Sequence, residues 1–211
     1  NESKNMSITR EQFEKIREKL GEHTSWALWT PQGVKAKSNV GDLSIFNDED
    51  KIPKTLKKLN PNIILAGLNA ANGEGEETTD IKPFANFHSS YAAATDYKIR
   101  YAIAGTALEG AFMTDVIKNH VETNSNVVNK SLKNNPEYER LKVEEFFREI
   151  NSVSNAPTIF AFGSMAYELI QKYNHDRLPV YKLYHYAYTQ SAATFREETL
   201  KTLALAGFAR R

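Results

Sequence analysis

The sequence predicts an α/β protein with three layers, in which helices cover both faces of a mainly parallel four-stranded sheet. Two observations lead to this prediction. Short apolar runs that end at or near glycine are typical of buried parallel strands, and segments with apolar residues at helical spacing alternate with them. Such alternation builds parallel sheets. The chain has 211 residues, so we expect one domain over residues 1–211, with residues 1–60 as a helical and irregular arm packed on it.

The arm is expected to begin with a helix. Thr9 and Gln12 form a capping-box pattern, apolar residues follow at helical spacing, and Gly21 is a suitable end. Residues 25–46 mix tryptophan and aliphatic residues with glycine and proline, which predicts short strands or irregular chain. Residues 51–59 predict a short amphipathic helix with outward lysines. We interpret these lysines as a solvated face, because acidic residues directly precede them.

Four strands and four further helices follow the arm. The predicted strands span residues 62–67, 111–114, 158–163 and 180–184. One predicted helix spans residues 91–109, two others begin at Pro136 and at Ser164, and the last spans residues 194–207. A long polar loop from Asn69 to about Ser90 separates the first of these strands from its helix. Loops of that length inside a compact domain are usually functional or mobile.

Composition and charge exclude several classes of function. The chain has 27 basic and 26 acidic residues, so no dominant basic field exists and phosphate binding must rely on a local patch. It has no cysteine, which excludes disulfides and thiolate metal sites and fits a reducing compartment. The start is polar, and no apolar run is long enough to span a membrane. We therefore expect a cytoplasmic protein without a membrane partner.

Cofactor motifs are absent from the sequence. The five histidines are scattered, without a pair four residues apart, so we expect no metal. The segment GLNAANGEG lacks the spacing of a dinucleotide fingerprint, and no phosphate-binding P-loop occurs. We expect no cofactor.

The chemistry is expected where the strands end, because ligands bind outside the carboxyl ends of parallel strands. Asn69 can hold a water molecule or donate to a ligand oxygen, or it can be a turn residue. Asp115 is either a site carboxylate or an N-cap or turn residue. His185 ends the fourth strand. In the long loop, Phe84 or Phe87 can stack on a flat ligand such as a base, or can anchor the loop to the core.

Together these segments resemble the uracil-DNA glycosylase superfamily over about residues 61–207. The segments that carry the resemblance are GLNAA (67–71), PFA (83–85), MTDVIK (113–118), IFAFGSMA (159–166) and HYAY (185–188). They occur in the family's order, at its two sequence motifs, its stacking phenylalanine, its base-reading strand and its strand-to-helix turn.

The resemblance implies a fold and a reaction. A base is flipped out of DNA and its N-glycosidic bond is hydrolysed without a metal or nucleotide cofactor. Asn69 would position the water and His185 would donate to the departing base oxygen. Phe84 would stack on the base, while Asp115 and Leu68 would bind it. The backbone would line the pocket or bind phosphate at Gly67, Ala70, Ala71, Gly163 and Ser164.

Several positions depart from the family pattern. Ala70 replaces a proline, and the second motif keeps only His185. Asp115 replaces an asparagine, and an ionised aspartate only accepts hydrogen bonds, so it suits a base that presents an amino donor. Carboxylates within residues 74–80 repel phosphate. The alternative is therefore a catalytically inactive relative that binds a nucleotide, a nucleic acid or a protein. The sequence does not determine its oligomeric state.

Overall fold

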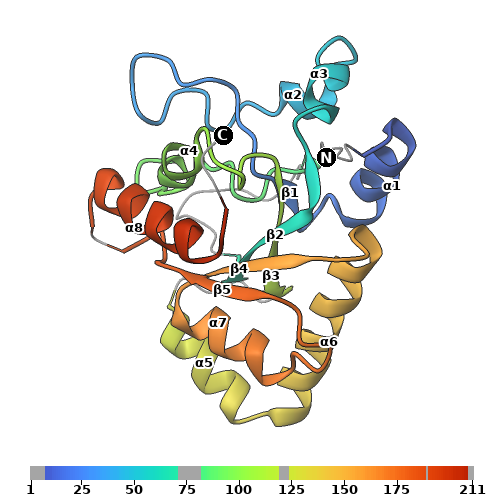
Figure 1. Ribbon diagram of the computed structural model, residues 1–211, viewed down its shortest axis with the longest axis vertical. Coiled ribbons are helices and arrows are strands. Elements are labelled where there is room, and N and C mark those ends of the chain that lie inside the picture. Colours follow the sequence, from blue (N-terminus) through green and yellow to red (C-terminus); the bar gives the residue numbers. More distant parts are fainter. Residues whose placement is uncertain (1–7, 71–81, 119–123, 189, 209–211) are drawn as a thin grey trace.

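A computed structural model of the protein describes residues 8–70, 82–118, 124–188 and 190–208. Its centre is a five-stranded sheet with the order β1-β3-β2-β4-β5 (Figure 1). The strands are β1 (Ser25–Trp26), β2 (Asn60–Asn69), β3 (Ala111–Ile117), β4 (Thr158–Phe162) and β5 (Val180–Leu183). The strands β3, β2, β4 and β5 pair in parallel in that order, whereas β1 pairs antiparallel with β3. The α/β class is confirmed, but the sheet is mixed and includes a fifth strand from the arm.

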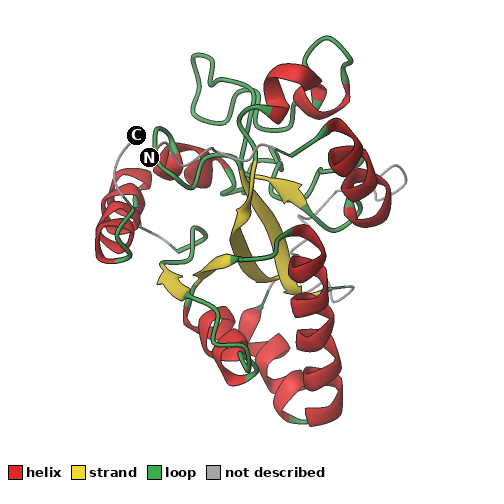
Figure 2. Ribbon diagram, turned by 45° about the vertical axis from the view of Figure 1, so that its right-hand side comes forward, coloured by secondary structure: helices red, strands yellow, loops and turns green. Residues whose placement is uncertain are grey.

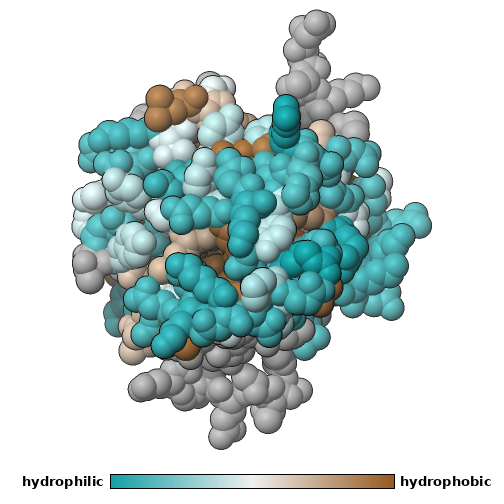
Figure 3. Space-filling view, turned by 90° about the horizontal axis from the view of Figure 1, so that it is seen from below, coloured by the Kyte–Doolittle hydropathy of each residue, from teal (hydrophilic) through white to brown (hydrophobic). Residues whose placement is uncertain are grey.

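Helices lie on both sides of this sheet (Figure 2). The helices are α1 (Arg10–Leu20), α2 (Ser44–Asn47), α3 (Ile52–Leu56), α4 (Tyr97–Ile103), α5 (Ser125–Lys133), α6 (Pro136–Val153), α7 (Ser164–Lys172) and α8 (Ala192–Leu205). Helices α6 and α7 contact the sheet from one side, where α5 packs on α6, and α4 and α8 lie together on the other. Seen from the side of α5, α6 and α7, the surface is mainly hydrophilic with small apolar areas, as expected of amphipathic helices (Figure 3).

The core consists of two apolar clusters, one on each face of the sheet. Successive side chains of a strand point to opposite faces. Along β2, Ile64 and Ala66 therefore join the cluster beneath α6 and α7, while Ile63 and Leu65 join the cluster beneath α4 and α8. This alternation decides which side of the sheet each strand-end residue faces.

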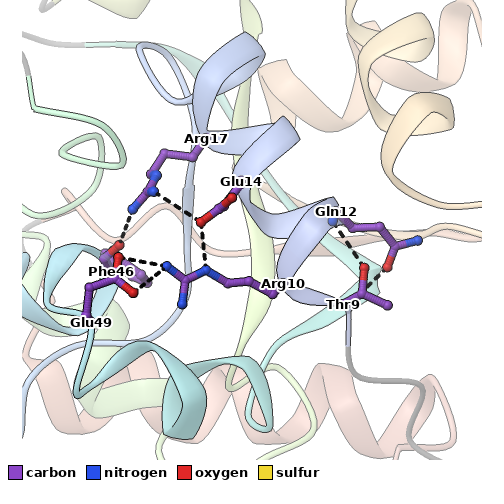
Figure 4. A network of polar contacts seen from close by, with 7 residues as sticks. All are labelled: Thr9, Arg10, Gln12, Glu14, Arg17, Phe46 and Glu49. Atoms are coloured by element: carbon purple, nitrogen blue, oxygen red, sulfur yellow. Dashed lines mark hydrogen bonds and ion pairs between the residues drawn. The ribbon is translucent and has the colours of Figure 1, made fainter.

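The arm is an integral part of the fold. The capping box of α1 is confirmed: the Thr9 hydroxyl accepts from the Gln12 N–H at 3.1 Å, and the Gln12 side chain accepts from the Thr9 N–H at 2.9 Å (Figure 4). Arg10 donates to both carboxylate oxygens of Glu49 at 2.8 Å. Phe46 is fully buried in the cluster beneath α6 and α7. The arm thus supplies core side chains as well as β1.

The predicted helix over residues 91–109 is wrong in length. Only Tyr97–Ile103 is helical, because the backbone leaves the helix at Ala104 and Gly105 takes a φ of 71°. Helix α5 was not predicted, although Asn124 caps it by accepting from the Asn126 N–H at 3.0 Å. Its helical spacing is regular, but it buries just two side chains, those of Val128 and Leu132.

Strands β2 and β3 are longer than predicted. Asn69 is the last residue of β2, and Asp115 lies inside β3, paired with Gly67. The apolar runs stop before these polar residues, so the predicted strands ended there. The sheet ladder continues because backbone hydrogen bonding does not depend on the side chain.

Candidate functional site

The carboxyl ends of β2, β3, β4 and β5 meet at one edge of the sheet, because these strands run parallel. On β2, Gly67 and Asn69 share the face of Leu65, and on β3, Asp115 shares the face of Met113. Both Leu65 and Met113 belong to the cluster beneath α4 and α8. We call the group on this face the strand-end site, and it consists of Gly67, Asn69, Asn86, Phe87, Asp115, His185 and Tyr186.

Asp115 is the most buried charged group of the site, with 4% of its surface exposed. Its Oδ2 accepts from Asn86 Nδ2 at 2.9 Å. Its Oδ1 lies directly over Gly67, so that a methyl group at position 67 would stand 2.6 Å from this oxygen. Burial raises the pKa of Asp115 to about 6, against the opposing effects of the Asn86 bond and of Lys118. Glycine at position 67 therefore makes room for the carboxyl group.

Asn86 holds this carboxyl in place and was not predicted. Its Nδ2 donates to the carbonyl oxygen of His23 at 2.9 Å as well as to Asp115, and its Oδ1 accepts from the Phe87 N–H at 3.1 Å. Both donors and an acceptor of the amide are thus engaged within the protein. The only sequence signal for Asn86 was its place between two aromatic residues in the long loop.

The turn around Asn86 has a strained backbone. Phe84 and Phe87 have φ values of 66° and 64°, in the left-handed region that large side chains avoid, at a cost of about 1–3 kcal/mol each. The surrounding contacts hold them there. Trp29 Nε1 donates to the carbonyl oxygen of Phe87 at 3.1 Å, and the His88 ring stacks on Trp29 at 5.0 Å. Strain of this kind is concentrated at functional sites.

The expectation that Phe84 stacks on a ligand is wrong for this structure. Its ring is fully buried among Phe13, Trp26 and Phe46, with the nearest centroids 5.5 Å away. Phe84 therefore anchors the loop to the core. Phe87 is buried as well, with 4% of its surface exposed, but its ring lies at the strand ends, 3.5 Å from where a methyl group at Gly67 would be.

His185 follows β5 and faces the same edge of the sheet. Its Nδ1 accepts from the Ala187 N–H at 3.0 Å, so the proton of the neutral ring is on Nε2. Burial lowers the pKa of His185 to about 4, which keeps the ring neutral at pH 7. The ring stacks on Tyr186 with centroids 4.5 Å apart. His185 is therefore a hydrogen-bond donor and not a cation.

Tyr186 lies between His185 and the group formed by Phe87 and Asp115. Its ring meets Phe87 edge-on at 6.5 Å and Phe162 at 5.0 Å. Burial, with added contributions from Asp96 and Asp115, raises its pKa well above 10. Tyr186 was not among the predicted site residues, because its position between His185 and Asp115 depends on the loop after β5.

Comparisons with models of protein families, with curated proteins and with solved structures found no match.

The remaining predicted site residues are distributed differently. Leu68 lies on the opposite face, buried in the cluster beneath α6 and α7, so its side chain cannot bind a ligand at the strand-end site. Asn69 is half-buried, with Nδ2 donating to the carbonyl oxygen of Ala70 at 3.2 Å, and Ala70 is half-buried beside it. Ala71 lies outside the described residues, as does the predicted acidic segment, residues 74–80.

A glycine makes the turn into α7. The helix begins at Ser164, as predicted, and its N-cap is Gly163, with a φ of 86° and no side-chain bond. Ser164 is the first helical residue and is exposed. A methyl group at Gly163 would stand 3.5 Å from Cβ of His185. Gly163 therefore brings the start of α7 close to the imidazole.

Thr114 neighbours Asp115 in β3 and therefore points to the other face of the sheet. Its hydroxyl donates to Glu149 of α6, and Lys118 Nζ lies 3.1 Å from the same carboxylate oxygen. The ammonium group also donates to the backbone oxygen of Asp115 at 2.7 Å. Lys118 is thus engaged with Glu149 and the backbone, and does not donate to the Asp115 carboxyl group.

A separate cavity of about 570 Å³ lies away from the strand ends. It is bordered by the lysines of the α3 region, by Trp29 and by Arg100 of α4. The Arg100 guanidinium donates to three backbone carbonyl oxygens of residues 30–38 and therefore holds that loop. Lys54 and Lys58 are exposed, in agreement with a solvated lysine face.

Two absences hold for the part of the chain that the structure describes. No helix there is both long and apolar enough to cross a membrane. Within those same residues, no three or more histidine and carboxylate side chains are grouped so that they could bind a metal ion.

Proposed function

We propose that this chain is a divergent member of the uracil-DNA glycosylase superfamily, and that it hydrolyses the N-glycosidic bond of a damaged base flipped out of DNA. The observation that carries the proposal is the neutral imidazole of His185, with Nδ1 occupied by the Ala187 N–H and Nε2 left as a donor. It follows β5 at the edge of the sheet where β2 and β3, which carry Asn69 and Asp115, also end.

The reaction separates charge at two points. As the bond between C1′ and the base nitrogen breaks, its electron pair moves into the base and negative charge develops on a base oxygen. A fixed Nε2–H donor from His185 stabilises that charge without transferring a proton. The side-chain oxygen of Asn69 holds the water that adds to C1′, and the proton that this water loses ends, by way of solvent, on the departing base. An amide is a weak activator, so turnover is slow.

In this proposal Asp115 and Phe87 bind the base. The carboxyl group of Asp115 and the flanking ring of Phe87 are side by side, next to Gly67. In this proposal Phe87 takes over the stacking role first expected of Phe84. The rings of Phe87 and Tyr186, which meet edge-on at 6.5 Å, would supply the apolar surface for the base.

The test is an excision assay on single-stranded and mismatched oligonucleotides that contain uracil, hypoxanthine or xanthine. We expect free base and an abasic site from the wild-type protein, and no product from Asn69→Ala or His185→Ala. The matched control is His175→Ala, which changes an exposed histidine after α7 and retains activity.

The outcomes separate the proposal from its alternative. No product from any oligonucleotide, together with salt-sensitive DNA binding, would identify a catalytically inactive binding module. Neither product nor DNA binding would reject both readings.

A further inference from the structure

We propose that the cavity between α3, α4 and the segment after β1 binds a small phosphate monoester that carries an apolar ring. This binding site goes beyond the proposed function and does not depend on it. Lys58 borders the cavity just before β2, and Glu109 borders it just before β3. Because β2 and β3 are parallel, the cavity lies at their amino ends, whereas the strand-end site lies at their carboxyl ends.

The size and the walls of this cavity suit a small molecule. Its volume of about 570 Å³ falls in the range of about 300–1,000 Å³ that is typical of ligand pockets. Among the side chains that border it, Trp29 and Ile103 are buried, Ile45 is half-buried, and Tyr101 exposes 44% of its surface. The cavity therefore offers apolar and aromatic side chains from three segments of the chain, against which an apolar ring can pack.

The charged side chains around the cavity favour an anion. Four of them are basic and two are acidic, namely Lys51, Lys54, Lys58 and Arg100, and Asp50 and Glu109. An excess of positive charge at a cleft raises the local concentration of anions. Charges beside an apolar wall also act through a lower effective dielectric constant than charges in bulk water, which strengthens the attraction.

Two of the four basic groups are free to bind a ligand. The Arg100 guanidinium donates to three backbone carbonyl oxygens, and Lys51 Nζ donates to Ser44 Oγ at 2.8 Å. Within the described residues, by contrast, the ammonium groups of Lys54 and Lys58 have no hydrogen-bond or ion-pair partner. Both lysines are exposed, so an anion that binds them displaces water and breaks no bond within the protein.

One of the two acidic groups opposes an anion. Glu109 Oε2 accepts from the Gly105 N–H at 2.9 Å, so this carboxylate is already engaged with the backbone. The carboxylate of Asp50 has no such partner in the part of the chain that the structure describes. The two free ammonium groups of Lys54 and Lys58 outweigh this single carboxylate.

The spacing of the two free lysines favours a phosphate over a carboxylate. Lys54 lies in α3, and the turn continues to Lys58, whose N–H donates to the Thr55 carbonyl oxygen at 2.9 Å. Residues four apart on a helical turn lie on the same side of it, so both ammonium groups can approach one ligand. A phosphate monoester carries about 1.5 to 2 negative charges at neutral pH and has three acceptor oxygens to share between them. A carboxylate carries only one charge.

The experiment is an NMR titration of the full chain at neutral pH with phenyl phosphate, compared with phenol, benzoate and inorganic phosphate. We expect phenyl phosphate to bind at least about fivefold more tightly than phenol or inorganic phosphate, and at least about twofold more tightly than benzoate. The signals that shift should include the indole N–H of Trp29, which borders the cavity and donates to the Phe87 carbonyl oxygen.

Three variants separate the two parts of the ligand. Lys54→Gln combined with Lys58→Gln should weaken phenyl phosphate binding at least about threefold, and Asp50→Asn should strengthen it. Ala104→Trp, at an exposed position that borders the cavity, should fill it and abolish the advantage of phenyl phosphate over inorganic phosphate. The matched control is Lys57→Gln, which changes an exposed lysine of the same turn that does not border the cavity and should leave the affinity unchanged.

Several results would overturn the proposal. Phenyl phosphate that binds no better than inorganic phosphate would show that the apolar wall takes no part, and equal binding of benzoate would reject phosphate as the anion. An affinity that the double lysine variant leaves unchanged, or shifts confined to the strand-end site, would reject the location. None of these results depends on base excision, so the cavity and the proposed reaction can be confirmed or rejected separately.

Discussion

Replacing Asp115 with asparagine should stabilise the protein at neutral pH. In the folded chain burial raises the pKa of this carboxyl group to about 6, whereas in the unfolded chain it has the ordinary value of about 3.9. The folded state therefore binds the proton more tightly, and ionisation opposes folding. The penalty is nearly absent at pH 4, grows as pH rises to 6 and is constant above. Its full size is about 3 kcal/mol.

The assay is urea denaturation of wild type and Asp115→Asn at pH 4, 5, 6 and 7.5. An amide has nearly the shape of the carboxyl group, and its oxygen can still accept from Asn86, so the variant should gain up to about 3 kcal/mol at pH 7.5 and almost nothing at pH 4. Asp176→Asn, at an exposed position, should show no such gain. A variant that is no more stable than wild type at pH 7.5, or whose gain does not shrink toward pH 4, would refute the reasoning.

Three further predictions concern Gly67, Phe84 and His185. Gly67→Ala should lower the free energy of unfolding by about 1–3 kcal/mol, because its methyl group meets Asp115 Oδ1; in an Asp115→Ser background the loss should be smaller, and equal losses in urea denaturation would contradict this contact. Phe84→Ala should cost about 3–5 kcal/mol as a core truncation, and a loss below about 1 kcal/mol would show that the ring is not part of the core. The His185 ring should titrate near pH 4 by NMR, and because its folded pKa lies below the unfolded value, its contribution to stability is complete above about pH 6.5 and is lost as pH falls toward 4. His185→Gln should therefore unfold less steeply with acid between those values, and titration at the ordinary pKa would contradict its burial.

Local patterns were sufficient where the determining interactions are local. The capping box of α1 satisfies backbone groups within a few residues of sequence, and the apolar run of β4 is contained in its own residues; both elements formed where they were predicted. The edge of the sheet that gathers Asn69, Asp115 and His185 also followed from the order of the strands. Even the face of Leu68 was implied, because it neighbours Asn69 in a strand and must point to the other side.

The sequence by itself therefore determined the α/β class and the edge of the sheet where polar side chains collect. Tertiary structure decided where each loop aromatic packs, because the left-handed backbone at Phe84 and Phe87 is maintained by contacts with β1, α2 and the segment around Trp29. It also decided that Asn86 bonds to Asp115, 29 positions away. Hydrogen bonds between segments that are far apart in the sequence depend on how the chain folds, and no periodicity in the sequence indicates which residues will meet.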